Sequence, residues 1–250
     1  MPTVRLGDVD LAYDEFGSGV PLLLFAPGGM RSRSAFWAER PGEWIDPRTA
    51  LVDRYRVIAL DQRNAGRSSG PVRATDGWHT YVDDAVALLR HLDIRAVAVM
   101  GGCIGVSYAL GFCARGDVEV LAAVLQNPIG KSPDGHDHIG PTFDEWAAAL
   151  RSTRSDVTAE ALASMRHNMF SGEFVFSVDR DFVRSCDVPM LVLPGNDAFH
   201  PTSTAEEIAR LAPRATLVRA WHPSEIGDAA AVALIRDFLE RTIPRASHQR

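Results

Sequence analysis

Short apolar runs alternate along the chain with amphipathic segments. The runs are rich in Val, Leu and Ile and lack polar alternation, which is typical of parallel strands that are buried on both faces. They cover Pro21 to Ala26, Tyr55 to Leu60, Ala96 to Met100, Val118 to Gln126, Pro189 to Pro194 and Ala215 to Ala220. The pattern predicts the strands of a core sheet.

Helical spacing of apolar residues appears between these runs, most clearly over 82–92 and 228–242. Strands that alternate with helices predict an α/β fold with a doubly wound, mostly parallel sheet. Two further apolar segments, 3–6 and 9–16, are separated by only two residues. We expect them to pair as an antiparallel hairpin at the sheet edge. One domain over residues 1–250 accounts for the whole pattern.

The segment 131–187 departs from the alternation because it holds no convincing core strand. Its apolar spacing predicts two short helices, around Thr142 to Ser152 and Thr158 to Met169. We interpret it as a small helical cap inserted before the penultimate strand. Within it, residues 133–141 read PDGHDHIGP, a composition that predicts a mobile loop.

Charge and cysteine content narrow the function class. The formal net charge of −6 and the absence of a lysine or arginine cluster argue against a nucleic-acid or anionic-membrane partner. The three cysteines show neither C-x-x-C nor Cys/His spacing, so we expect no disulfide framework, no zinc site and a cytoplasmic location. The N-terminus lacks a signal-peptide pattern, and no apolar stretch approaches the ~20 residues of a membrane span. The sequence predicts a soluble, unprocessed protein and gives no oligomeric state.

The strongest chemical signal is the pentapeptide GGCIG at 101–105, directly between an apolar run and a helical pattern. The spacing G-x-nucleophile-x-G is that of a nucleophile elbow, a tight strand-to-helix turn that projects one side chain. Cys103 occupies the projecting position, where the helix N-terminus favours a thiolate. The N–H of Ile104 can donate to an oxyanion. Taken alone, the motif fits a glycine-rich turn with a buried cysteine equally well.

Further motifs follow in a fixed order along the chain. They are Pro27-Gly28-Gly29-Met30 after the first core run, the segment Asp61 to Ser68 after the next, Asn196-Asp197 after PMLVLPG, and His222 after ATLVRAW. With the pentapeptide, they resemble the α/β-hydrolase family over the whole chain apart from the cap and the last few residues. The resemblance implies the α/β-hydrolase fold. It also implies a structural role for the Asp61 to Ser68 turn.

The same resemblance implies a catalytic triad in the order nucleophile, acid, histidine: Cys103, Asp197 and His222. A competitor for the base is His200, three residues after Asp197. Because His200 shares the loop of Asp197 and precedes Pro201, we expect its ring to cap or pack instead.

The oxyanion loop departs from the family pattern. The usual His-Gly is replaced by Phe25-Ala26, and Pro27 has no N–H to donate. The donors are therefore expected to be Ile104 together with the loop Gly28, Gly29 and Met30, with Gly29 or Met30 as the second donor.

Cysteine in place of the usual serine changes the preferred chemistry. A thiolate attacks carbonyls well and leaves easily, which suits esters, lactones and thioesters. We expect a hydrolase that acts on a small-molecule acyl substrate through an acyl-cysteine intermediate, with no metal and no organic cofactor. Two alternatives stay open: an acyltransferase or carrier-thioester chain-releasing enzyme with the same triad, and a lyase or non-catalytic binder on the same fold.

Overall fold

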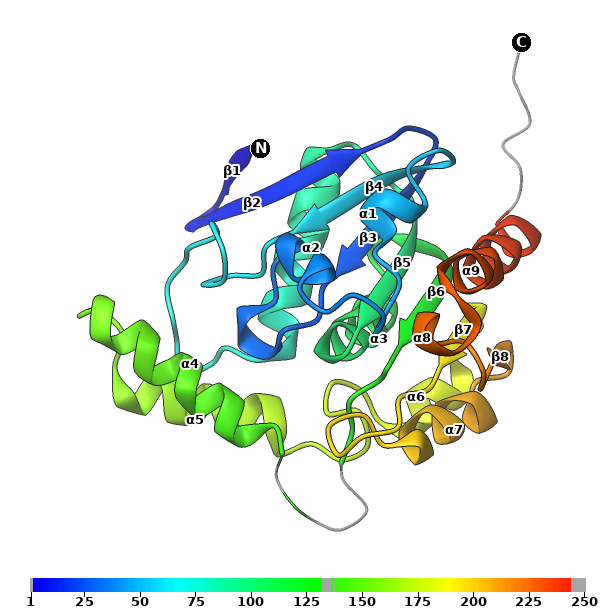
Figure 1. Ribbon diagram of the computed structural model, residues 1–250. Coiled ribbons are helices and arrows are strands. Elements are labelled where there is room, and N and C mark those ends of the chain that lie inside the picture. The colour runs from blue at the N-terminus through cyan, green and yellow to red at the C-terminus, as the bar shows by residue number, and fades with distance from the viewer. Residues whose placement is uncertain (1, 132–135, 137, 244–250) are drawn as a thin grey trace.

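An eight-stranded sheet forms the centre of the computed structural model, which describes residues 2–131, 136 and 138–243 (Figure 1). The strand order across the sheet is β1-β2-β4-β3-β5-β6-β7-β8. The strands are β1 (Thr3–Leu6), β2 (Val9–Phe16), β3 (Val20–Phe25), β4 (Tyr55–Leu60), β5 (Ala96–Gly102), β6 (Glu119–Gln126), β7 (Met190–Leu193) and β8 (Ala215–Leu217).

The pairing agrees with the pattern of the sequence. β1 pairs antiparallel with β2, and β2 pairs antiparallel with β4. All remaining pairs, from β4 through β8, are parallel. The expected edge hairpin and the mostly parallel sheet are thereby confirmed.

Helices cover both faces of the sheet, so alternate side chains of one strand enter two different apolar layers. Leu23 of β3 packs in the layer that includes α2 and α3, whereas Leu22 and Leu24 pack in the layer that includes α9. All three side chains are fully buried. The helices are α1 (Pro47–Ala50), α2 (Trp78–His91), α3 (Ile104–Arg115), α7 (Thr202–Leu211), α8 (Pro223–Ile226) and α9 (Asp228–Thr242), with short 3-10 helices η1 (Gly29–Arg31) and η2 (Ser34–Ala38).

Between β6 and β7 the described residues form helices and no strand, as expected of a cap. The helices are α4 (Gly140–Thr153), α5 (Ala159–Phe170) and α6 (Arg180–Ser185), of which the sequence predicted the first two. α4 and α5 pack side by side and project from the sheet (Figure 1). α4 also contacts η1, where Thr142 Oγ1 would lie 3.6 Å from a Cβ added at Gly29. Most of the loop predicted over 133–141 lies outside the described residues.

The register of the parallel strands brings their carboxyl ends to one edge. Gly102 of β5 pairs with Gln126 of β6, and Gln126 pairs with Leu193 of β7. The residues that follow these three positions therefore meet, and ligands of open α/β sheets bind at this edge.

Candidate active site

Cys103 stands at the turn between β5 and α3. Its backbone has φ 56° and ψ −123°, a strained conformation for a residue with a side chain. The turn depends on its glycines. A Cβ at Gly105 would lie 1.9 Å from the carbonyl oxygen of Phe25, and one at Gly101 would lie 2.4 Å from the carbonyl oxygen of Gly105. These close backbone approaches explain why glycine flanks the cysteine.

Asp197 and His200 form the second part of the site, in the loop between β7 and α7. Oδ1 of Asp197 accepts hydrogen bonds from the backbone N–H groups of Phe199 (2.8 Å) and His200 (2.9 Å). This turn folds the His200 ring back, so that its Nδ1 lies 2.8 Å from Oδ2 of Asp197. The ring is held between a carboxylate and the protein interior, since His200 is only 7% exposed.

The other ring nitrogen of His200 faces the thiol. Nε2 is buried and makes no hydrogen bond of good geometry with the described residues. The Cys103 sulfur nevertheless lies close enough for its charge to act on the ring. Catalytic hydrogen bonds are often long or poorly aligned before substrate binds and tighten in the substrate complex.

His222, the expected partner of Asp197, lines the same cavity as Asp197, but the carboxylate is hydrogen-bonded to His200 instead, and this corrects the sequence-based assignment. It is the N-cap residue of α8, and its ring stacks on Trp221 with 4.3 Å between ring centroids. Its side chain hydrogen-bonds to neither Asp197 nor Cys103 in the part of the chain that the structure describes. The sequence argument failed because it took the short distance to Pro201 as a barrier. The Asp197 turn ends just before that proline and leaves the His200 ring free to face the carboxylate.

The three groups shift one another's ionisation. Burial raises the pKa of the Cys103 thiol, but the nearby His200 and two backbone N–H groups outweigh burial and lower it below the ordinary 9.0. Burial lowers the pKa of His200, yet the Cys103 charge and Asp197 raise it to about 10. The hydrogen bond from His200 lowers the pKa of Asp197 to about 2. The arrangement favours a thiolate beside an imidazolium.

The backbone N–H groups of Ile104 and Gly28 lie near enough to the Cys103 sulfur to lower the pKa of the thiol. Gly28 has φ 114°, and a Cβ there would lie 2.7 Å from the Phe36 ring. Ile104 begins α3 as expected. Gly29 and Met30, the favoured second donors, belong to η1, and Met30 is buried. The geometry thus favours Gly28 over its two neighbours as the second donor.

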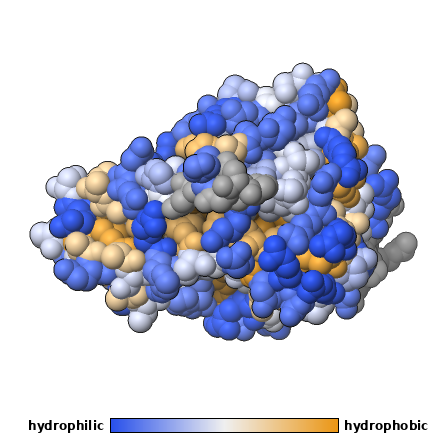
Figure 2. Space-filling view, turned by 90° about the horizontal axis from the view of Figure 1, so that it is seen from below, coloured by the Kyte–Doolittle hydropathy of each residue, from blue (hydrophilic) through white to orange (hydrophobic). Residues whose placement is uncertain are grey.

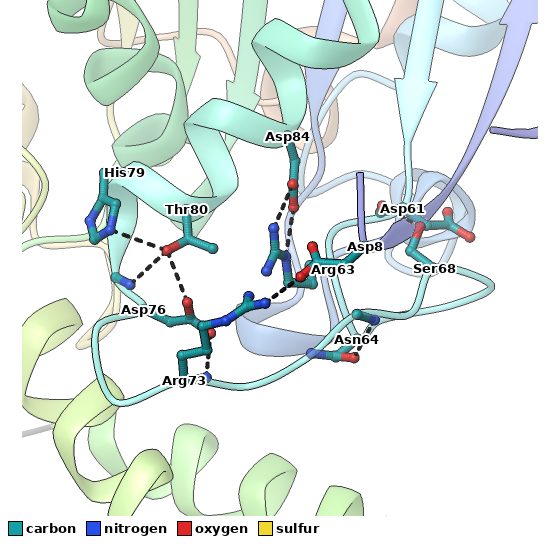
Figure 3. Close-up of polar contacts among 12 residues, drawn as sticks. Asp8, Asp61, Arg63, Asn64, Ser68, Arg73, Asp76, His79, Thr80 and Asp84 are labelled. Atoms are coloured by element: carbon teal, nitrogen blue, oxygen red, sulfur yellow. Dashed lines mark hydrogen bonds and ion pairs between the residues drawn. The ribbon is translucent and has the colours of Figure 1, made fainter. Parts of the chain in front are cut away.

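The segment Asp61 to Ser68 ties loops together beside the sheet (Figure 3). Asp61 accepts from the backbone N–H groups of Ser34 (2.8 Å) and Arg67 (3.0 Å). Arg63 donates two hydrogen bonds to Asp84 of α2, at 2.9 and 2.7 Å. This segment acts as a structural brace, in line with the role that the resemblance implied.

Apolar surface is visible on the face that is seen from below in Figure 1, bordered by polar side chains (Figure 2). Beside the site, Phe199 is 41% exposed, which makes it the one exposed large apolar side chain among residues 2–131, 136 and 138–243.

The described residues include no group of three or more His, Cys, Asp or Glu side chains suited to a metal ion. No helix in the same residues is long and apolar enough to cross a bilayer.

Comparison with known proteins identifies the family of the chain. Residues 21–181 match the family described as alpha/beta hydrolase fold. The chain belongs to this family.

Curated relatives and a solved structure extend the match. The chain is 35% identical over 128 residues to a non-heme haloperoxidase of Rhodococcus erythropolis, covering 50% of this chain and 43% of the relative. It thus spans less than half the length of that relative. It is 27% identical over 237 residues to a 2-hydroxy-6-oxo-6-(2'-aminophenyl)hexa-2,4-dienoic acid hydrolase of Metapseudomonas resinovorans, covering 81% and 76%. A meta-cleavage product hydrolase from Pseudomonas fluorescens IP01 has a similar fold, with TM-score 0.67, 21% identity and coverage of 96% and 98%.

Proposed function

We propose that the chain hydrolyses an activated acyl compound, an ester, lactone or thioester, with Cys103 as nucleophile, His200 as acid and base, and Asp197 as the group that orients His200. The observation that carries the proposal is the place of Cys103 at the strained turn before α3, beside the hydrogen-bonded His200–Asp197 pair. The lowered pKa of Cys103 agrees with this placement. Catalytic cysteines occupy such electropositive, partly exposed sites, and Cys103 is partly exposed.

In the first step the Cys103 thiolate attacks the acyl carbon. The N–H groups of Ile104 and Gly28 stabilise the negative charge that develops on the carbonyl oxygen. His200 gives its proton to the departing oxygen or sulfur, and an acyl-cysteine remains.

In the second step water releases the acyl group. Acylation removes the thiolate charge, which is a main cause of the raised pKa of His200. The ring then returns toward its ordinary basicity and accepts a proton from water, while Asp197 holds it in place. The change in charge at Cys103 therefore switches His200 from acid to base.

The relatives support hydrolysis as the reaction. The protein from Metapseudomonas resinovorans, aligned over most of this chain, is named a hydrolase of a dienoic acid. The substrate of that relative is not transferred to this chain, because the proposed nucleophile here is a thiol. Acyl transfer to another acceptor would use the same residues.

The test is intact-protein mass spectrometry after mixing the protein with activated esters, lactones and thioesters. We expect one acyl adduct, located at Cys103 by peptide mapping and absent from Cys103→Ala. Release of free acid without an added acceptor supports hydrolysis, whereas release only with an added amine or thiol would favour the acyltransferase. Turnover by Cys103→Ala at the wild-type rate would contradict the mechanism.

A further inference from the structure

A polar cavity of about 230 Å³ lies beside the Asp197–His200 pair. Its lining comes from the loop after β6, the loop after β7, the start of α8 and the residues before α1. His200 belongs to the lining, and Cys103 does not, among the residues that the structure describes. The mechanism proposed above uses no space on this side of the pair.

Asn127 provides the first reason to expect a ligand there. It follows β6 and is only 4% exposed. Its Nδ2 donates to the carbonyl oxygen of Glu43 at 3.1 Å, which fixes the orientation of the amide. Oδ1 is buried and has no hydrogen-bond partner. Buried acceptors without a partner are rare in folded proteins because they lose their hydration, so the cavity contains an acceptor that awaits a donor.

Gly195 sits opposite this oxygen. A Cβ there would lie 3.3 Å from Oδ1 of Asn127 and 2.3 Å from Cβ of His200. Gly195 and Asn127 both line the cavity, and position 195 has no side chain that would stand between Oδ1 and a ligand in it.

The remaining polar groups specify the ligand as a cationic donor. Carboxylates of Glu43, Asp197 and Glu225 line the cavity together with the imidazoles of His200 and His222, and no lysine or arginine does so in the described part of the chain. Asp197 holds His200, which leaves the carboxylates of Glu43 and Glu225 for a ligand. Glu43 contacts Arg40 at the surface (3.3 Å). Glu225 has no ion pair within the described ranges. Donors on a charged nitrogen form the stronger hydrogen bonds to such acceptors.

We propose that this cavity binds an organic ammonium group through Oδ1 of Asn127 and the carboxylates of Glu225 and Glu43. The carboxylates do not converge closely enough for a metal ion among the described residues, whereas a substituted ammonium can span them. The group belongs either to the leaving group of the substrate or to a separate amine. Only the first source rests on the proposed hydrolase function.

Binding is tested without turnover, by saturation-transfer NMR with n-propylammonium chloride and with 1-propanol as the neutral isostere. The variant is Glu43→Gln/Glu225→Gln, and the control is Glu119→Gln/Glu160→Gln, two exposed glutamates that do not line the cavity and carry the same change in charge. We expect wild type and control to bind propylammonium alike and the cavity variant to bind it roughly tenfold more weakly. Equal binding of propanol and propylammonium, or equal weakening in both variants, would overturn the site.

The two sources are separated with 3-aminopropyl and butyl esters of one acid. If the ammonium belongs to the substrate, the aminopropyl ester has a KM roughly tenfold lower than the butyl ester, and the cavity variant loses this advantage. Equal KM values together with propylammonium binding assign the cavity to a separate amine. Loss of all ester hydrolysis with binding intact would instead contradict the proposed function and leave the ammonium site standing.

Discussion

Burial and charge act in opposite directions on the thiol of Cys103. Burial alone favours the neutral thiol, and the two other cysteines follow that rule, since burial raises the pKa of Cys113 and of Cys186. Only at Cys103 do a neighbouring imidazole and backbone N–H groups reverse the direction. Reactivity should therefore differ sharply among the three cysteines.

Limited alkylation with iodoacetamide checks this difference. Cys103 should be labelled first, and the rate should rise with pH with a midpoint below 9.0, because the thiolate is present above the lowered pKa. His200→Ala should move the midpoint upward, since burial then acts without the opposing charge. Preferential labelling of Cys113, or a midpoint that His200→Ala leaves in place, would refute the coupling of thiol and imidazole.

The residues of the site differ in how well sequence reveals them. Glycine spacing identifies Cys103 and Ile104 because the turn tolerates no Cβ at 101 or 105. Asp197 follows a core strand and is placed by that position. His200 was missed as the partner of Asp197, although its three-residue spacing from the acid was the available signal. The backbone N–H groups of residues 199 and 200 donate to the Asp197 carboxylate and form a tight turn. Only this turn shows that the His200 ring folds back onto Asp197.

At the level of elements, the buried pair Arg63–Asp84 connects the turn after β4 to α2. The two side chains are 9% and 7% exposed. Burial raises the pKa of Asp84 more than Arg63 lowers it, so the ion pair does not fully offset the loss of water. Removing one partner of such a pair strongly lowers the free energy of unfolding, whereas replacing both partners with apolar residues changes it little.

Chemical denaturation of Asp84→Ala should show a loss of about 3–5 kcal/mol in the free energy of unfolding, because Arg63 is left buried and unpaired. The control is Asp83→Ala on the same helix, α2, where the exposed carboxylate of Asp83 contacts Arg115 of α3 at 3.1 Å. The loss of unfolding free energy in Asp83→Ala should stay below about 1 kcal/mol. Arg63→Met/Asp84→Leu should recover most of the stability. Equal losses in Asp84→Ala and Asp83→Ala would contradict a stabilising role for the buried Arg63–Asp84 pair.

Strand and helix positions were predictable wherever packing on the sheet dictates the pattern. β4 and α9 occupy the expected ranges, because β4 is apolar on both faces and α9 is apolar on one. β8 is only Ala215–Leu217, shorter than the run expected over 215–220. α2 begins at Trp78, four residues before the expected Val82, and α6 was not foreseen. α6 has six residues, too few for a periodic pattern to be recognised.

For the whole molecule, the helical pair α4–α5 packs on the apolar layer that also includes α2 and α3. Trp78 donates from Nε1 to the carbonyl oxygen of Met169 (2.6 Å), and α4 packs against η1 beside the oxyanion loop. The layer on the other face of the sheet, which includes α9, contains no residue of the pair among the described residues. The pair therefore lies where it can shape the substrate pocket without completing the sheet.

Replacing 140–170 with a short Gly-Ser linker should leave one cooperative thermal transition at a lower Tm, because part of the apolar layer under α4 and α5 is exposed. The ratio of kcat/KM between short-chain and long-chain esters should change by more than the rate on the smallest ester. Loss of any cooperative transition would show that α4 and α5 belong to the core of the domain.

The central claim is that His200, and not His222, works with Cys103 and Asp197. The most direct measurement is kcat for His200→Ala and His222→Ala on the ester or thioester that acylates Cys103. We predict a loss on the order of 100-fold or more for His200→Ala, the scale of general acid and base catalysis. His222→Ala should keep most of its turnover, because the His222 ring stacks on Trp221 and, among the described residues, hydrogen-bonds to neither Cys103 nor Asp197. A large loss in His222→Ala with His200→Ala nearly unchanged would contradict the account.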